Sequence, residues 1–147
     1  MDIAGSFNVY VQQGDDFNVT LVSHEGDDKL EKASVKRDGN TLEVSMNNKW
    51  SFFTKSSNGS KLDLHLTMPE LSEMELTGTS HTVIKDFNAE ATNIEAEVSG
   101  ASTAHINVVN HLDADLSGAS QVLYVGEPTE VRSETSGAAH ITKVTIE

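Results

Sequence analysis

The chain has 147 residues, no cysteine, a net charge of −13 and a hydrophobic share of 37%. This length indicates one domain, and the lack of cysteine excludes disulfides, thiolate metal sites and a cysteine nucleophile. The excess of carboxylates argues against nucleic acid and against a bare anionic membrane as partners. No apolar run is long enough to insert into a membrane.

The N-terminal half predicts strands joined by polar turns. The stretches 7–14 and 17–24 alternate apolar and polar residues, as half-buried strands do. An Asp-Gly pair between two such runs predicts a hairpin over 35–46. A further alternating strand over 61–69 ends in a proline. With abundant threonine, serine, asparagine and valine, these patterns predict an all-β protein.

A polar loop over 47–61 carries three aromatic side chains. Trp50, Phe52 and Phe53 are candidates for stacking on a sugar or docking on a protein partner. Alternatively, they cap the open end of the core, and we expect burial rather than exposure.

A five-residue pattern, exemplified by "LSGAS", recurs through the second half of the chain. Its glycines are Gly78, Gly100, Gly118 and Gly137, which are 22, 18 and 19 residues apart, and Gly5 lies in a similar N-terminal context. An apolar residue usually stands two positions before each glycine and a hydroxyl residue one position before it. An acidic residue stands three positions before each of the four repeat glycines.

Repeats of this length, built from short strands and turns, predict a parallel β-helix-like solenoid with the glycines at its corners. Equivalent residues of successive coils would then lie above one another, so each column of the alignment becomes a ladder. The serines beside the glycines read as corner residues, because a catalytic serine is not needed in every coil.

The acidic column comprises Glu75, Glu97, Asp115 and Glu134, and we expect it on an outward, wet face. Carboxylate oxygens suit hard cations such as Ca²⁺. The column lacks the curved loop of a tight calcium site, so we expect a solvated face with no ordered metal and only weak cation binding.

The residues give no pattern of an enzyme. His81 and His140 share a column, but two other coils separate them, which argues against joint metal ligation. No phosphate-binding glycine loop leads from a strand into a helix. We therefore assign no catalytic residue and no cofactor.

The run "LHLTMPELSEMELTGTS", followed by "VSGAS", "LSGAS" and "TSGAA", resembles the putative auto-transporter adhesin, head GIN domain family of Bacteroidetes envelope proteins. "FNVYVQQGDDFNVTLVS" and "VKRDGNTLEVSM" match the N-terminal pattern of the same family. The resemblance implies an all-β fold with right-handed β-helical stacking, export through a signal peptide, frequent lipid attachment and no catalysis.

We expect a single domain over 1–147, with N-terminal strands and a hairpin over 1–68 and β-helical repeats over 69–147, sharing one core. Two functions stay open. One is an exported cell-envelope or extracellular module that binds a glycan or protein. The other is a structural protein whose unpaired β-helix ends associate with one another.

Overall fold

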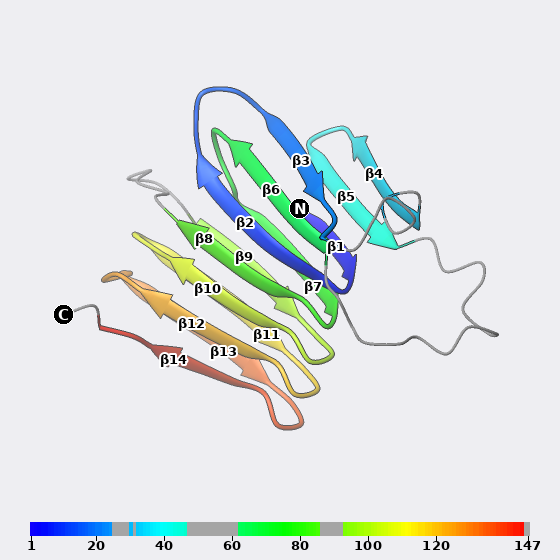
Figure 1. The fold of residues 1–147 in the computed structure, drawn as a ribbon. Coiled ribbons are helices and arrows are strands. Elements are labelled where there is room, and N and C mark those ends of the chain that lie inside the picture. Colours follow the sequence, from blue (N-terminus) through cyan, green and yellow to red (C-terminus); the bar gives the residue numbers. More distant parts are fainter. Residues whose placement is uncertain (25–29, 31, 47–61, 86–92, 146–147) are drawn as a thin grey trace.

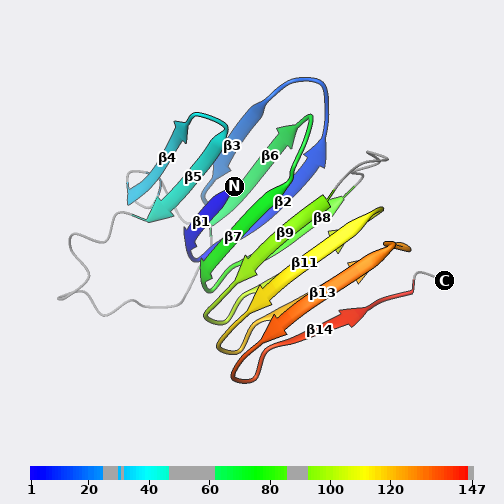
Figure 2. The same cartoon turned by 180° about the vertical axis from the view of Figure 1, so that it is seen from behind.

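The structure is a computed structural model that describes residues 1–24, 30, 32–46, 62–85 and 93–145. These residues form two seven-stranded sheets, which face each other across one apolar interior (Figures 1 and 2). The predicted all-β class is confirmed.

We call the two sheets sheet A and sheet B. Sheet A contains, in spatial order, β13 (Glu130–Thr135), β11 (His111–Leu116), β9 (Asn93–Val98), β7 (Glu73–Gly78), β1 (Asp2–Gly5), β5 (Thr41–Met46) and β4 (Ala33–Asp38). Sheet B contains β14 (His140–Lys143), β12 (Gln121–Val125), β10 (Thr103–Asn107), β8 (His81–Lys85), β2 (Phe7–Gln13), β6 (Leu62–Met68) and β3 (Asn18–Val22).

From β7 onward, consecutive strands alternate between the two sheets, and a pair of them forms one coil. Each strand from β9 onward pairs in parallel with the strand two places before it. Leu76 pairs with Val98, and Val98 pairs with Leu116, which is the register that the alignment of the glycines predicts.

The N-terminal strands enter the middle of both sheets. β1 lies between β5 and β7, and β2 lies between β6 and β8, in each case with parallel pairing on both sides. β3 and β4 are antiparallel to their neighbours and lie at one end of the stack. The predicted hairpin is β4–β5. Its two-residue turn is Gly39-Asn40, because Asp38 still pairs with Thr41.

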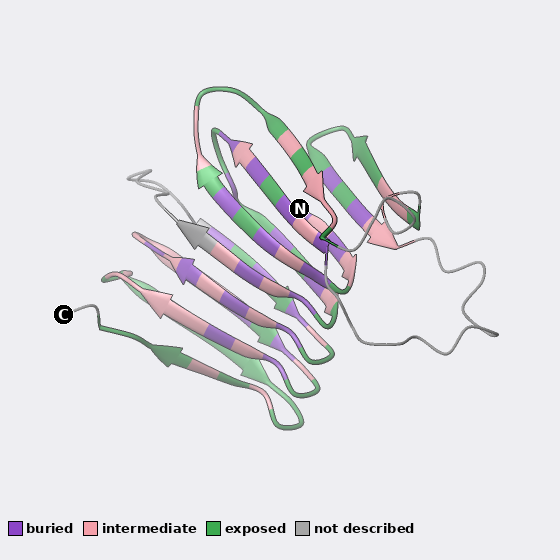
Figure 3. Ribbon diagram, viewed as in Figure 1, coloured by how far each residue is buried: buried purple, intermediate pink, exposed green. Residues whose placement is uncertain are grey.

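Buried and more exposed residues alternate along most strands (Figure 3), so one set of side chains of these strands belongs to the interior. Residues from both halves of the sequence share this core, including Phe7 and Leu64 from the first half and Ile94 and Leu116 from the second. The buried hydroxyl of Thr82 is an exception to the apolar pattern, since its Oγ1 has no hydrogen-bond partner among the described residues.

The glycines of the repeats stack at the corner where the chain passes from sheet A to sheet B. Gly5 pairs with Gly78, and the backbone oxygen of each stacked glycine lies beside the next glycine of the stack. A buried serine follows two residues later in three coils, at Ser80, Ser102 and Ser120. Their hydroxyls donate to backbone oxygens of the preceding coil.

The last coil is the most exposed part of the stack (Figure 3). All six residues of β13 are exposed, and Val131 on its inward side retains 38% of its surface. Among the described residues, no helix is long and apolar enough to cross a membrane.

Candidate functional site

The two sheets present outer faces of opposite character. The outer face of sheet A, which we call the acidic face, carries carboxylates on every strand from β5 to β13. They are Asp2, Glu43, Glu73, Glu75, Glu95, Glu97, Asp113, Asp115, Glu130 and Glu134. The lysine and arginine in these rows are Lys36 and Arg132. In the strand register, Lys36 stands opposite Glu43 and Arg132 stands opposite Asp113.

The predicted acidic column is continuous across the strands. Glu75 pairs with Glu97, Glu97 with Asp115, and Asp115 with Glu134. Asp2 extends the row on the other side of Glu75. The sequence alone did not reveal that the row continues through Glu43 to Lys36, because those strands lie outside the glycine repeat.

Glu75 lies at the centre of this row, and carboxylates surround it on both neighbouring strands. Partial desolvation, together with repulsion from Asp2, Glu97 and Glu73, raises the pKa of Glu75 above its ordinary value, although the N-terminal ammonium opposes the shift. A shallow hollow of about 140 Å³ beside it is lined by Glu75, Glu97 and Asp115. Among the described residues, no three histidine or carboxylate side chains are arranged to hold a metal ion.

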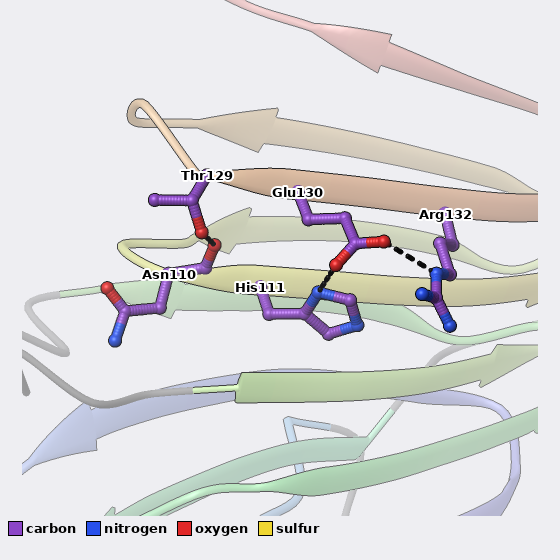
Figure 4. Close-up of polar contacts among 5 residues, drawn as sticks. All are labelled: Asn110, His111, Thr129, Glu130 and Arg132. Carbon is purple, nitrogen blue, oxygen red and sulfur yellow. Dashed lines mark hydrogen bonds and ion pairs between the residues drawn. The ribbon is translucent and has the colours of Figure 1, made fainter.

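The acidic face is less uniformly acidic on its last strand, β13, where Arg132 lies beside Glu130 (Figure 4). Glu130 lies between two partners: its Oε1 accepts from Arg132 Nε at 2.7 Å, and its Oε2 is 3.4 Å from His111 Nδ1. Thr129 Oγ1 donates to the backbone oxygen of Asn110 at 2.8 Å and ties the turn before β13 to the preceding coil. These contacts locally neutralise the edge of the sheet.

The outer face of sheet B, which we call the neutral face, carries amides, hydroxyls, histidines, a tyrosine and aliphatic side chains. It comprises Asn8, Tyr10, Gln12, Asp63, His65, Thr67, His81, Val83, Thr103, His105, Gln121, Leu123, His140 and Thr142. Asp63 is the one carboxylate in this described set. Lys85 stands opposite Gln12 in the register of β2 and β8. The face therefore offers hydrogen bonding and apolar contact with few charged residues.

Asp63 is itself held by neighbouring side chains. Its carboxylate accepts from Asn8 Nδ2 at 2.8 Å, and its other oxygen lies 2.8 Å from His24 Nε2. Partial desolvation would raise the pKa of Asp63, but the hydrogen bonds from His24 and Asn8 and the nearby His65 outweigh it and lower the pKa. The side chain is thus a fixed acceptor at one edge of the neutral face.

A groove of about 280 Å³ crosses the neutral face beside two stacked rings. Tyr10 and His65, on neighbouring strands, have ring centroids 4.9 Å apart and ring planes inclined by 18°. Gln12, Thr67 and Val83 complete the outward lining of the groove. Tyr10 is 38% exposed, so part of its side chain is available to a partner.

A second pair of rings lies further along the same face. His81 and His105 have ring centroids 5.2 Å apart in an edge-to-face arrangement. His81 pairs with Thr103, and Gln121 separates Thr103 from His140, so the two histidines of the predicted column lie far from each other.

The sequence-predicted site residues have different positions relative to these faces. Trp50, Phe52 and Phe53 lie outside the described residues, so their role stays a prediction. The corner glycines Gly5, Gly78, Gly100, Gly118 and Gly137 lie at one end of the strands and not on either face.

Sequence reasoning missed the Tyr10–His65 pair. The alternation of their two strands was visible and places both side chains outward. The pairing of β2 with β6 was not, because some fifty residues separate the two strands in the sequence.

The family model described as "Putative auto-transporter adhesin, head GIN domain" matches residues 1–95. The match runs from β1 into β9, so the repeats at Gly100, Gly118 and Gly137 lie beyond it. No curated protein matches the chain.

Solved structures resemble the chain at low identity. A putative adhesin from Parabacteroides merdae is 9% identical over 98% of this chain and 90% of that one, with a TM-score of 0.45. A putative adhesin from Bacteroides fragilis is 15% identical over 97% of this chain and 90% of that one, with a TM-score of 0.40. A putative lipid binding protein from Parabacteroides distasonis is 14% identical over 97% of this chain and 91% of that one, with a TM-score of 0.41.

The family model covers well over half of the chain and includes β1 and β2, which are paired on both sides within the two sheets. The chain therefore belongs to the putative auto-transporter adhesin, head GIN domain family.

Proposed function

We propose that this chain is a non-enzymatic binding module of the cell envelope or cell surface, and that it recognises a glycan or protein partner through the neutral face. The observation that carries this proposal is the contrast between the two outer faces. One presents rows of mutually repelling carboxylates, whereas the other presents hydrogen-bonding and aromatic groups with a single carboxylate, Asp63.

The chemistry of the neutral face suits adhesion. An exposed tyrosine supplies a large contact area at a low entropic cost, and its hydroxyl can donate or accept a hydrogen bond. The amides of Asn8 and Gln12 already bond to Asp63 and Thr67, so they are fixed in position before a partner arrives. Preorganised polar groups lose less entropy when they bind.

The acidic face suits a different role. Carboxylates at the spacing of neighbouring strands repel one another, and this repulsion is tolerable only while water screens it. A partner that removed this water would raise the repulsion further. The acidic face therefore opposes lateral packing of one sheet on another and favours an open surface.

The proposal is tested by binding of the purified chain to glycan arrays and to cells, with Tyr10→Ala and His65→Ala combined in one variant. We expect a loss of roughly tenfold or more in affinity, because these rings line the central groove. The matched control combines Thr77→Ala and Ser99→Ala on the sheet A side. Equal losses in both variants, or unchanged binding of the first, would remove the neutral face from consideration.

Self-association is the second candidate, and one observation favours it. Among the described residues, β13 pairs only with β11 and β14 only with β12, so each leaves one edge open. A lysine at Ser133, on the inward side of β13, would block edge pairing. Sedimentation that shows concentration-dependent assembly of the native chain, abolished in Ser133→Lys, would support this function, and a monomer at all concentrations would exclude it.

A further inference from the structure

A cavity at the N-terminal end of the stack contains an aromatic ring with a cation fixed beside it. Phe17 lies in the turn between β2 and β3, and 46% of its surface is exposed. A single exposed aromatic is ordinary on a protein surface. Phe17 is different because the guanidinium carbon of Arg37 lies 5.7 Å from its ring centroid.

The conformation of Arg37 is set by the hairpin that carries it. Arg37 pairs with Leu42, which is buried, so both side chains lie on the inward side of sheet A. Arg37 Nε donates to the backbone oxygen of Gly39 at 3.0 Å, at the turn of the same hairpin. One nitrogen of the guanidinium and its ring contact are therefore used to hold the group in place.

The remaining donors of Arg37 have no carboxylate partner among the described residues, although the chain carries 23 acidic residues and 10 basic ones. Arg132 and Lys143, by contrast, each form an ion pair at 2.7 Å. A guanidinium that is oriented but not neutralised presents two parallel N–H groups, which match the two oxygens of a carboxylate.

The cavity beside this pair has a volume of about 420 Å³. Leu42 contributes to its apolar lining, and the Asn40 amide, the Glu70 carboxylate and the hydroxyls of Thr41 and Ser72 line it with polar groups. Its volume lies in the range of small-ligand sites, and because its lining residues other than Leu42 are exposed, a ligand would lie in an open hollow.

We propose that this cavity binds an acidic sugar, namely a carboxylate-bearing pyranose at the end or side of a glycan chain. Arg37 would hold the sugar carboxylate, and the ring of Phe17 would lie against the C–H face of the pyranose. Asn40 and Glu70 provide the donor and acceptor that neighbouring sugar hydroxyls need.

Each part of the lining favours this ligand class over other anions. A phosphate would bring more negative charge beside Glu70, which has no role in its recognition. A peptide carboxylate would use Arg37, but the peptide chain lacks the flat C–H face that a pyranose presents to the ring of Phe17. A neutral sugar would use the hydroxyl-binding groups and leave Arg37 unpaired.

This inference does not rest on the neutral face as the recognition surface. Phe17 and Arg37 line the cavity at the end of the stack formed by β3 and β4, whereas Tyr10 and His65 lie on the outer face of β2 and β6 and line a different hollow. Variants at the two places therefore report on separate sites.

The test is an NMR titration of the ¹⁵N-labelled chain with methyl β-D-glucuronide, in which the amide chemical shifts are measured at each ligand concentration. We expect saturable shifts at the amides of Asn40, Thr41 and Ser72. The neutral analogue methyl β-D-glucoside should bind roughly tenfold more weakly or worse, because it lacks the partner of the guanidinium.

Substitutions separate the two contacts. Arg37→Met should weaken binding of the glucuronide roughly tenfold, and Arg37→Lys should weaken it less, because it retains the charge without the planar fork. Phe17→Leu keeps an apolar side chain, so the fold should be retained, but it removes the aromatic ring. It should therefore weaken the binding of both the glucuronide and the glucoside. Arg132→Met is the matched control at the opposite end of the stack, and it should leave the titration unchanged.

Three outcomes would overturn the proposal. The first is equal binding of glucuronide and glucoside, which would leave Arg37 without a role. The second is equal binding of acetyl-diglycine, which would make the site a plain carboxylate receptor. The third is the absence of shifts at Asn40, Thr41 and Ser72 at tens of millimolar glucuronide.

Discussion

The backbone oxygen of Gly100 occupies the space that a Cβ atom on Gly118 would need, at 2.6 Å from the ideal position of that atom. The close approach has a cause in the ladder, because the same oxygen accepts a hydrogen bond from the N–H of Ala119 at 2.8 Å. Gly118 also has a φ of +74°, a region that side chains with a Cβ rarely adopt. Corner geometry and coil spacing are thus fixed by the same few atoms.

Gly118→Ala should destabilise the fold by roughly 2–4 kcal/mol, since it combines backbone strain with a clash against a backbone atom that cannot move away. Gly39→Ala is the matched control, because Gly39 has a φ of +57° but no atom within 4 Å of the added Cβ. It should cost only about 1 kcal/mol. Urea unfolding of both variants measures the difference, and equal losses would show that the stacked carbonyl is not a constraint.

Ser120→Ala should cost about 1 kcal/mol of unfolding free energy. The Ser120 hydroxyl is buried and lies 3.0 Å from the Val98 oxygen and 2.7 Å from the Ser117 oxygen. The comparison is Ser136→Ala at an exposed corner position, which should stay within about 0.5 kcal/mol of the parent. Thermal and urea denaturation together distinguish the two, and a neutral Ser120→Ala would mean that the hydroxyl contributes nothing to the corner.

Thr82→Val should stabilise the protein by about 1 kcal/mol, because valine has a similar shape and removes a buried hydroxyl without a partner. Thr103→Val, at an outward position on the neighbouring strand, is the control and should change little. Loss of stability in Thr82→Val would indicate that the hydroxyl is satisfied in solution by a trapped water.

Glu75→Gln should stabilise the chain at neutral pH by roughly 0.2–0.5 kcal/mol, a small value because the side chain is exposed and water screens it. The folded protein raises the pKa of Glu75 above its ordinary value of 4.5, so the folded state binds the proton more readily than the unfolded state. The penalty on the native chain is therefore present above the raised pKa and disappears as the pH falls below 4.5.

Unfolding free energies at pH 7 and pH 4, each at low and high salt, measure this dependence. The gain of Glu75→Gln should shrink with acid and with salt. Glu127→Gln is the control, since Glu127 lies outside the acidic rows and pairs with Lys143 at 2.7 Å, so its removal should give no gain. A gain in Glu75→Gln that is independent of both pH and salt would rule out charge repulsion as its source.

The repeat could be derived from the sequence because its physical requirement recurs in every coil. A glycine that touches the glycine below it leaves the same chemical neighbours each time, so aligning Gly78, Gly100 and Gly118 also aligns the core residues and the acidic column. The strands of the N-terminal half were visible for a similar reason, since alternation is a local property.

The candidate sites could not be derived in the same way. Tyr10 meets His65 across the pairing of β2 with β6, and Phe17, in a turn beside sheet B, meets Arg37 on a strand of sheet A. No local sequence pattern encodes either contact. The sequence favoured Trp50 and its neighbours because aromatic residues cluster there, and that hypothesis stays a prediction. Single aromatics at separated positions become a site only once the order of the strands is known.

The placement of β1 and β2 between strands from much later in the chain has a kinetic consequence. Repeat stacks commonly grow from any nucleus by adding one neighbouring unit at a time. Here β1 and β2 have both edges paired only after β5 to β8 have formed. The pairings of β2 with β6 and β8 close loops of more than fifty residues. We infer that the coils after β8 can form early by local growth, and that docking of the N-terminal segment limits the rate of folding.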